Sequence, residues 1–173
     1  LQHISIGDNL ILNPKATGTL ILDSLLPGKR LFMFASGTGI APFTSLIRDP
    51  EIYEKFEKII LIHTCREVKD LNYGKSIVET IGKDSLIGEY ADRVFYYPTV
   101  TRETFHTKGR ITDLLKTGQF FQDLQLTPIS RDTDRAMICG SLGLNKDIKT
   151  FLETSGLKEG ARNRPAEFVL EKA

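Results

Sequence analysis

A turn of small residues between an apolar strand and a helix carries the clearest chemistry in this sequence. Residues 34–43 read FASGTGIAPF, and the helix is expected to begin near Pro42. Gly37 and Gly39 would let a phosphate approach the backbone, Thr38 offers a hydroxyl, and Pro42 presets φ for the first helical turn. Backbone N–H groups at such a turn have no partner inside the helix, so the segment predicts a phosphate site.

The turn matches neither the dinucleotide motif G-x-G-x-x-G nor the Walker motif with its lysine. An ordinary tight turn between a strand and a helix is therefore the alternative interpretation. In that case the Thr38 hydroxyl would cap its own helix. The choice between a phosphate site and an ordinary turn depends on the elements that surround this segment.

Apolar segments rich in β-forming residues recur along the chain, separated by stretches with helical periodicity or loop character. We expect strands at 31–35, 59–63, 93–97, 135–139 and 167–170. The segments between them are expected to carry helical apolar stripes at 43–47 (with Tyr53 and Phe56), 77–81, 111–115 and 144–152. The predicted fold class is α/β, a five-stranded parallel open sheet with helices on both faces. A ligand would bind at the carboxyl ends of the strands.

Composition limits the class of protein. A chain of 173 residues with 26% charged and 40% hydrophobic residues can bury a sizeable core. The net charge of +1 argues against nucleic-acid binding. No apolar run approaches the ~20 residues of a membrane span. Cys65 and Cys139 lack metal-ligand spacing, and His3, His63 and His106 lie far apart, so we expect no metal site and a reducing, cytoplasmic compartment.

The first 30 residues do not fit the parallel sheet. Two short strands are expected at 8–12 and 19–22, joined by a turn at 13–18 and followed by a linker at 23–29. Two strands rarely stand alone, so their leucines would leave an apolar face uncovered. We therefore expect residues 1–30 to be the C-terminal remnant of a β-barrel domain cut from a longer protein, and residues 31–173 to form the α/β domain.

Several segments, in this order and spacing, resemble the bacterial ferredoxin–NADP reductases, an FAD-dependent family that also serves flavodoxin. They are LQHISIGD, KATGTLILDSLLPGKRLFMFASGTGIAPFTSLIRDPE, LIHTCREVKDLNY, YYPTVTRE, KGRITDLL, DRAMICGS and FVLEKA. The resemblance implies an N-terminal antiparallel barrel that holds FAD and a C-terminal α/β domain that binds NADP. It also implies hydride transfer between NADPH and the flavin, with single electrons passing to ferredoxin or flavodoxin.

The resemblance assigns cofactor contacts to particular residues. Arg66, Arg102 and Arg110 would bind the 2′-phosphate of NADP, for which a guanidinium fork is well suited, and Cys65 and Thr101 stand beside two of them. The FAD contact Thr38 belongs to the same turn as two further cofactor-binding positions, Gly39 and Pro42. The residues expected near the nicotinamide are Cys139, Gly140, Ser141, Leu142 and Gly143.

Plainer alternatives accompany these assignments. An arginine at a strand end can be a solvated surface residue, and a free cysteine is most often a small core residue. Cys139 has no histidine or lysine nearby in sequence to activate it, so we do not expect it to act as a nucleophile.

The chain also departs from the family pattern, and two rival functions stay open. The family's flavin motif R-x-Y-S is not in the chain, and bacterial members continue past the final EKA, so this piece is expected to lack bound FAD. One rival is another flavin reductase of the same superfamily, such as an oxygenase reductase component. The other is a non-catalytic dinucleotide-binding domain, which would lack the R-x-Y-S motif upstream.

Overall fold

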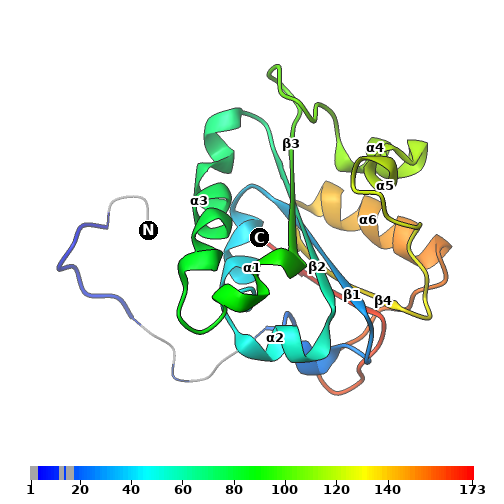
Figure 1. Cartoon of the computed structure of the whole chain (residues 1–173), viewed down its shortest axis with the longest axis horizontal. Coiled ribbons are helices and arrows are strands. Elements are labelled where there is room, and N and C mark those ends of the chain that lie inside the picture. The colour runs from blue at the N-terminus through cyan, green and yellow to red at the C-terminus, as the bar shows by residue number, and fades with distance from the viewer. Residues whose placement is uncertain (1–3, 12–13, 15–17) are drawn as a thin grey trace.

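Five parallel strands form the centre of the molecule (Figure 1). The computed structural model describes residues 4–11, 14 and 18–173. The strands are β1 Arg30–Ser36, β2 Lys58–Cys65, β3 Val94–Val100, β4 Asp134–Gly140 and β5 Phe168–Lys172. Their order is β3-β2-β1-β4-β5, with every neighbouring pair parallel. The five-stranded parallel sheet predicted from the sequence is confirmed.

Helices cover both faces of the sheet, as predicted (Figure 1). The first face carries α1 Ile40–Leu46, α2 Pro50–Lys55 and α3 Asn72–Thr80. The second face carries α4 Ile111–Thr117, α5 Gln119–Asp123 and α6 Leu142–Thr154. The chain therefore crosses to opposite faces after β1 and after β4, which creates a switch point between these two strands.

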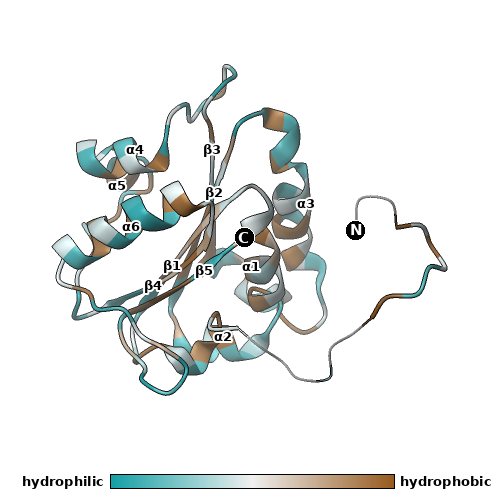
Figure 2. Cartoon of the chain, turned by 180° about the vertical axis from the view of Figure 1, so that it is seen from behind, coloured by the Kyte–Doolittle hydropathy of each residue, from teal (hydrophilic) through white to brown (hydrophobic). Residues whose placement is uncertain are grey.

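Two hydrophobic cores separate the sheet from its two helical layers. Side chains alternate along β1, so that Leu31 and Met33 enter the first core while Phe32 and Phe34 enter the second. Figure 2 shows the apolar strands between helices whose outer surfaces are hydrophilic. Because both faces are buried, the strands are nearly continuous apolar runs, the pattern typical of parallel sheets.

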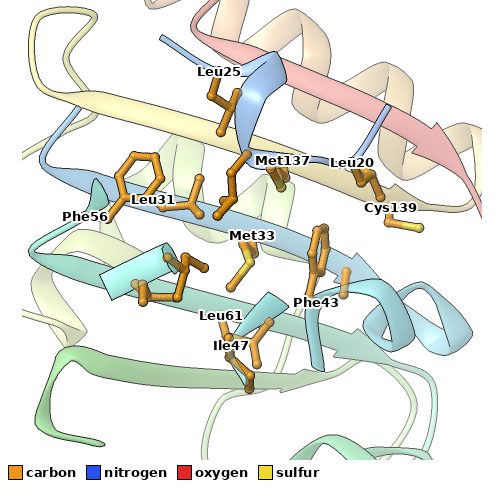
Figure 3. Close-up of a cluster of buried hydrophobic side chains, with 14 of the residues drawn as sticks. Leu20, Leu25, Leu31, Met33, Phe43, Ile47, Phe56, Leu61, Met137 and Cys139 are labelled. Atoms are coloured by element: carbon orange, nitrogen blue, oxygen red, sulfur yellow. The ribbon is translucent and has the colours of Figure 1, made fainter. Parts of the chain in front are cut away.

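The described part of the first 30 residues differs from the prediction. Residues 8–11 and 19–21 form no strand, and Leu22–Ser24 is a 3₁₀ turn, so the expected strands are wrong there. Leu20 and Leu25 pack instead against the first core beside Met137 and Cys139 (Figure 3). A strand needs a partner for its backbone N–H and C=O groups, and residues 8–11 pair with no described strand.

Another part of that prediction concerns residues that the structure does not describe. Positions 12, 13 and 15–17, which include part of the expected turn, lie outside the described residues. Residues 4–11 project away from the α/β body (Figure 1), and Ile6 and Ile11 are exposed. The domain boundary at residue 30 stays a prediction.

An ion pair between Arg30 and Asp134 joins the amino ends of β1 and β4, at the edge of the sheet opposite the carboxyl ends. The Asp134 carboxylate accepts from Arg30 Nε at 2.7 Å and Arg30 Nη2 at 2.5 Å, and also from the Ser130 N–H at 2.7 Å. The Asp134 side chain is fully buried, so these bonds replace its hydration. These hydrogen bonds therefore stabilise the pairing of β1 with β4 at this edge.

Candidate functional site

A cleft made of two adjoining pockets lies at the carboxyl ends of β1 to β4. The first pocket has a volume of about 400 Å³ and the second about 290 Å³. Their shared lining residues are Ser36, Thr64, Arg66, Thr101 and Ser141. The cleft lies where ligands bind in open α/β sheets, beside the switch point between β1 and β4.

The turn after β1 contributes backbone to the first pocket. It is a 3₁₀ turn, Gly37–Gly39, and α1 starts directly after it at Ile40, earlier than the start expected near Pro42. Gly37 has φ +53°, in the left-handed region that favours glycine. Thr38 is exposed and lines the first pocket. No side chain caps α1, so the capping role considered for the Thr38 hydroxyl is not found.

Glycines let the turns after β1 and β4 touch each other. A Cβ on Gly39 would overlap the carbonyl oxygen of Cys139 and lie 2.6 Å from its carbonyl carbon. A Cβ on Gly140 would overlap Ser36 Oγ and lie 2.8 Å from Leu144 Cδ2. Packing therefore explains Gly39 without a ligand, and a cofactor contact at this position stays a prediction.

A serine pair fastens the two turns together. The Ser141 N–H donates to Ser36 Oγ at 3.0 Å, and Ser141 Oγ accepts the Leu144 N–H at 3.3 Å as the N-cap of α6. This helix begins at Leu142, two residues before the helical stripe expected over 144–152. The cap uses one free N–H of the helix and fixes the position of the Ser141 side chain in the cleft.

Backbone pairing between β2 and β3 continues past both strands and brings two arginines together. The Thr101 N–H donates to Cys65 O at 3.1 Å, and the Arg102 N–H donates to Arg66 O at 3.0 Å. Arg66 lines both pockets and Arg110, just before α4, lines the second. Arg102 is exposed beside Arg66 and lines neither pocket.

The arginine charges are available to a ligand. In the part of the chain that the structure describes, Arg66, Arg102 and Arg110 take part in no ion pair. Carboxylates are also present, with Asp70 on the first pocket and Asp147 on the second. Two arginines that line the cleft, with Arg102 beside one of them, favour an anion with several oxygen acceptors.

Both cysteines stay protonated at neutral pH. Burial raises the pKa of the Cys65 thiol to about 11, although the Gly37 backbone opposes this shift. Burial also raises the pKa of Cys139, which lies in the first core. Neither thiol is activated for nucleophilic attack, which agrees with the role expected for Cys139.

The structure brings about half of the predicted site residues into the cleft. Those that line it are Thr38, Cys65, Arg66, Thr101, Arg110, Ser141 and Gly143. Those that line neither pocket are Gly39, Pro42, Arg102, Cys139, Gly140 and Leu142. Sequence reasoning missed Ser36 and Thr64, which are register partners on β1 and β2. Their place at the carboxyl ends of two neighbouring strands was the signal that could have found them.

Known proteins match this chain along its length. The oxidoreductase NAD-binding domain family matches residues 33–150. The flavodoxin/ferredoxin–NADP reductase of Rhodobacter capsulatus is 56% identical over 100% of this chain and 64% of the relative. The ferredoxin–NADP reductase of Azotobacter vinelandii is 47% identical over 100% of this chain and 68% of the relative. The chain belongs to the ferredoxin–NADP reductase family.

Solved structures agree with membership in the reductase family. A ferredoxin NADP⁺ reductase from Neisseria gonorrhoeae with bound FAD and NADP is 27% identical with a TM-score of 0.78, covering 91% of this chain and 61% of that chain. A flavohemoglobin from Malassezia yamatoensis, 16% identical with a TM-score of 0.61, covers 90% of this chain and 35% of that chain and shares the fold. This chain spans about two thirds of the curated reductases it matches. The family resemblance read from the sequence is confirmed.

Two kinds of feature are absent from the described residues. They contain no helix long and apolar enough to cross a membrane. They also contain no group of three or more His, Cys, Asp or Glu side chains that could hold a metal ion.

Proposed function

We propose that this chain binds NADP(H) for an FAD-dependent reductase that moves electrons between NADPH and ferredoxin or flavodoxin. The observation that carries the proposal is the set of unpaired arginines beside one cleft at the carboxyl edge of the sheet. The names of the relatives from Rhodobacter and Azotobacter support the choice of cofactor and of protein partners.

The chemistry of the cleft fits a phosphorylated dinucleotide. Arg66 and Arg110 supply guanidinium donors, while Thr101 and Ser141 supply hydroxyls. A Cβ on Gly143 would meet nothing within 4 Å, so the cofactor can approach the backbone there. We assign the 2′-phosphate to the three arginines, because a fork of N–H donors suits a phosphate better than a single ammonium does.

The first pocket fits the reacting half of the cofactors. Thr38, Cys65 and Ala173 line it together with the serines of β1 and of the α6 cap. We assign Thr38 to FAD, and Ser141 with its neighbours Leu142 and Gly143 to the nicotinamide half of NADP. These groups are hydroxyls, backbone and a thiol whose pKa burial raises, and the Asp70 carboxylate and the Arg66 guanidinium line the same pocket.

The residues of this chain would act by binding and orientation. A bound FAD would supply the exchange between the two-electron hydride of NADPH and a protein acceptor that takes single electrons. Such a transfer needs no proton from a side chain of this cleft. The Ser36–Ser141 bond and the paired loops after β2 and β3 hold the binding groups in fixed positions, so that the nicotinamide is presented in one orientation.

Calorimetric titration of the chain with NADP⁺ and NAD⁺ tests the cofactor choice. We expect NADP⁺ to bind far more tightly, because NAD⁺ lacks the phosphate that the arginines recognise. Equal affinities would contradict the proposal and favour the rival interpretation, a reductase or binding domain without selection for the 2′-phosphate. In the full-length protein, loss of the flavin absorption band on anaerobic addition of NADPH tests the electron transfer itself.

A further inference from the structure

A buried histidine lies directly beneath the turn after β1. His63 on β2 is fully buried, and its Nε2 lies 3.1 Å from the carbonyl oxygen of Gly37. Its Nδ1 lies 3.1 Å from the Tyr96 hydroxyl on β3, and Cys65 Sγ lies 3.2 Å from Nε2. The imidazole thus connects β3 to the backbone of the Gly37–Gly39 turn.

One tautomer satisfies the contacts with both Gly37 and Tyr96. With the proton on Nε2, the ring donates to the Gly37 carbonyl, and Nδ1 accepts from the Tyr96 hydroxyl. With the proton on Nδ1, a lone pair of Nε2 would face the Gly37 oxygen, which would keep only the Ile40 N–H as a donor. Repulsion between the two facing lone pairs favours the Nε2–H form.

The surroundings hold this ring in place and keep it uncharged. Gly74 on α3 makes room for it, because a Cβ there would lie 2.9 Å from His63 Nδ1 and 3.2 Å from the Tyr96 hydroxyl. Burial lowers the pKa of His63, although the Gly37 carbonyl and Asp70 act in the opposite direction. The ring is therefore a fixed neutral donor to one carbonyl.

The direction of that carbonyl decides the direction of the next N–H. In a trans peptide the C=O of one residue and the N–H of the following residue point to opposite sides. The Gly37 C=O points inward to His63, so the Thr38 N–H points away from the ring. Gly37 at φ +53° is the hinge at which this peptide could turn over, since glycine accepts conformations that other residues resist.

We propose that His63 is a positioning residue that holds the Gly37–Thr38 peptide in the orientation that offers the Thr38 N–H, as distinct from the Thr38 side chain assigned to FAD, to a phosphate of NADP in the first pocket. The proposal rests on the proposed function, because it needs a dinucleotide in the cleft. His63 touches no ligand itself. Its effect passes through one backbone carbonyl to one backbone donor.

Calorimetry on four single variants of the chain tests the proposal, with NADP⁺ and 2′-AMP as probes. 2′-AMP carries the phosphate for the arginines but has no pyrophosphate, so it reports on the arginines alone. We expect His63→Leu to raise the Kd for NADP⁺ about tenfold, the loss of one charge-assisted hydrogen bond, and to leave the Kd for 2′-AMP unchanged. His63→Gln, whose amide can still donate, should recover part of the affinity.

Tyr96→Phe and Tyr97→Phe form a matched pair for the case in which His63→Leu does not fold. Each removes one hydroxyl from β3, but the Tyr97 hydroxyl bonds Asp123 on the other face of the sheet, at 2.6 Å. We expect two- to threefold weaker NADP⁺ binding for Tyr96→Phe and no change for Tyr97→Phe. Nitrogen-15 NMR of the wild-type ring should show the Nε2–H tautomer.

The outcomes separate this proposal from the proposed function. An Nδ1–H tautomer, or a folded His63→Leu chain with unchanged NADP⁺ affinity, would overturn the positioning role alone. Equal weakening of NADP⁺ and 2′-AMP would show that His63 supports only the fold, and would overturn it as well. A wild-type chain that prefers NAD⁺ or binds neither dinucleotide would instead refute the proposed function.

Discussion

Replacing Arg66 with alanine is expected to weaken NADP⁺ binding about tenfold and to leave NAD⁺ binding unchanged. Arg66 lines both pockets and is held beside Arg102 by the backbone bond between them. A charge-assisted hydrogen bond contributes roughly 1.5–3 kcal/mol, and exposure of the side chain to solvent favours the lower end. About 1.4 kcal/mol corresponds to a tenfold change in Kd.

Isothermal titration of the wild type, Arg66→Ala and Arg162→Ala with both dinucleotides measures this effect. Arg162 is an exposed arginine in the loop before β5, so its replacement changes the net charge equally without touching the cleft. We expect the Kd for NAD⁺ divided by the Kd for NADP⁺ to fall only for Arg66→Ala. If Arg162→Ala reduced the ratio as much, the effect would be one of overall charge, and recognition of the 2′-phosphate by Arg66 would be refuted.

Three further predictions concern salt, packing and charge. NADP⁺ affinity should fall as added salt shortens the Debye length below ~10 Å, and a Kd that does not depend on salt would count against arginine recognition. Gly39→Ala should lower the free energy of unfolding by about 1–3 kcal/mol in urea titrations, whereas Gly143→Ala in open space at the start of α6 should not destabilise the chain. Asp134→Ala should cost about 3–5 kcal/mol by the same measurement, because it leaves the Arg30 guanidinium without its buried partner, and a loss below 1 kcal/mol would contradict that.

The parallel sheet was predictable because its strands are buried on both faces. Continuous apolar runs such as residues 59–63 are the local signature of such burial, and they need no knowledge of the partner strand. The first 30 residues were harder. The alternation of Leu20 and Leu22 indicates that one face of this segment is buried, but the pattern does not identify the part of the protein that covers it. In the structure these leucines pack on the sheet of the α/β domain.

The site was predictable only where it depends on the ends of strands. Arg66 and Arg110 could be placed at the ligand edge because the carboxyl ends of all strands in a parallel sheet, and the starts of the helices that follow, lie at that edge. The packing role of Gly39 could not, because it depends on β4, a hundred residues further along the chain. The contacts of His63 with Gly37 and Tyr96 also join three segments distant in sequence, so a lone histidine in an apolar strand gave no signal of them.

Titration of the nitrogen-15-labelled chain with NADP⁺, followed by NMR of the backbone amides, locates the cofactor site. We expect the largest shifts in the turns after β1, β2, β3 and β4, including the amides of Thr38, Arg66 and Ser141. Amides at the opposite edge, around Arg30 and Asp134, should stay in place. Shifts centred on that amino edge, or none at saturating NADP⁺, would contradict a cofactor site at the carboxyl ends of the strands.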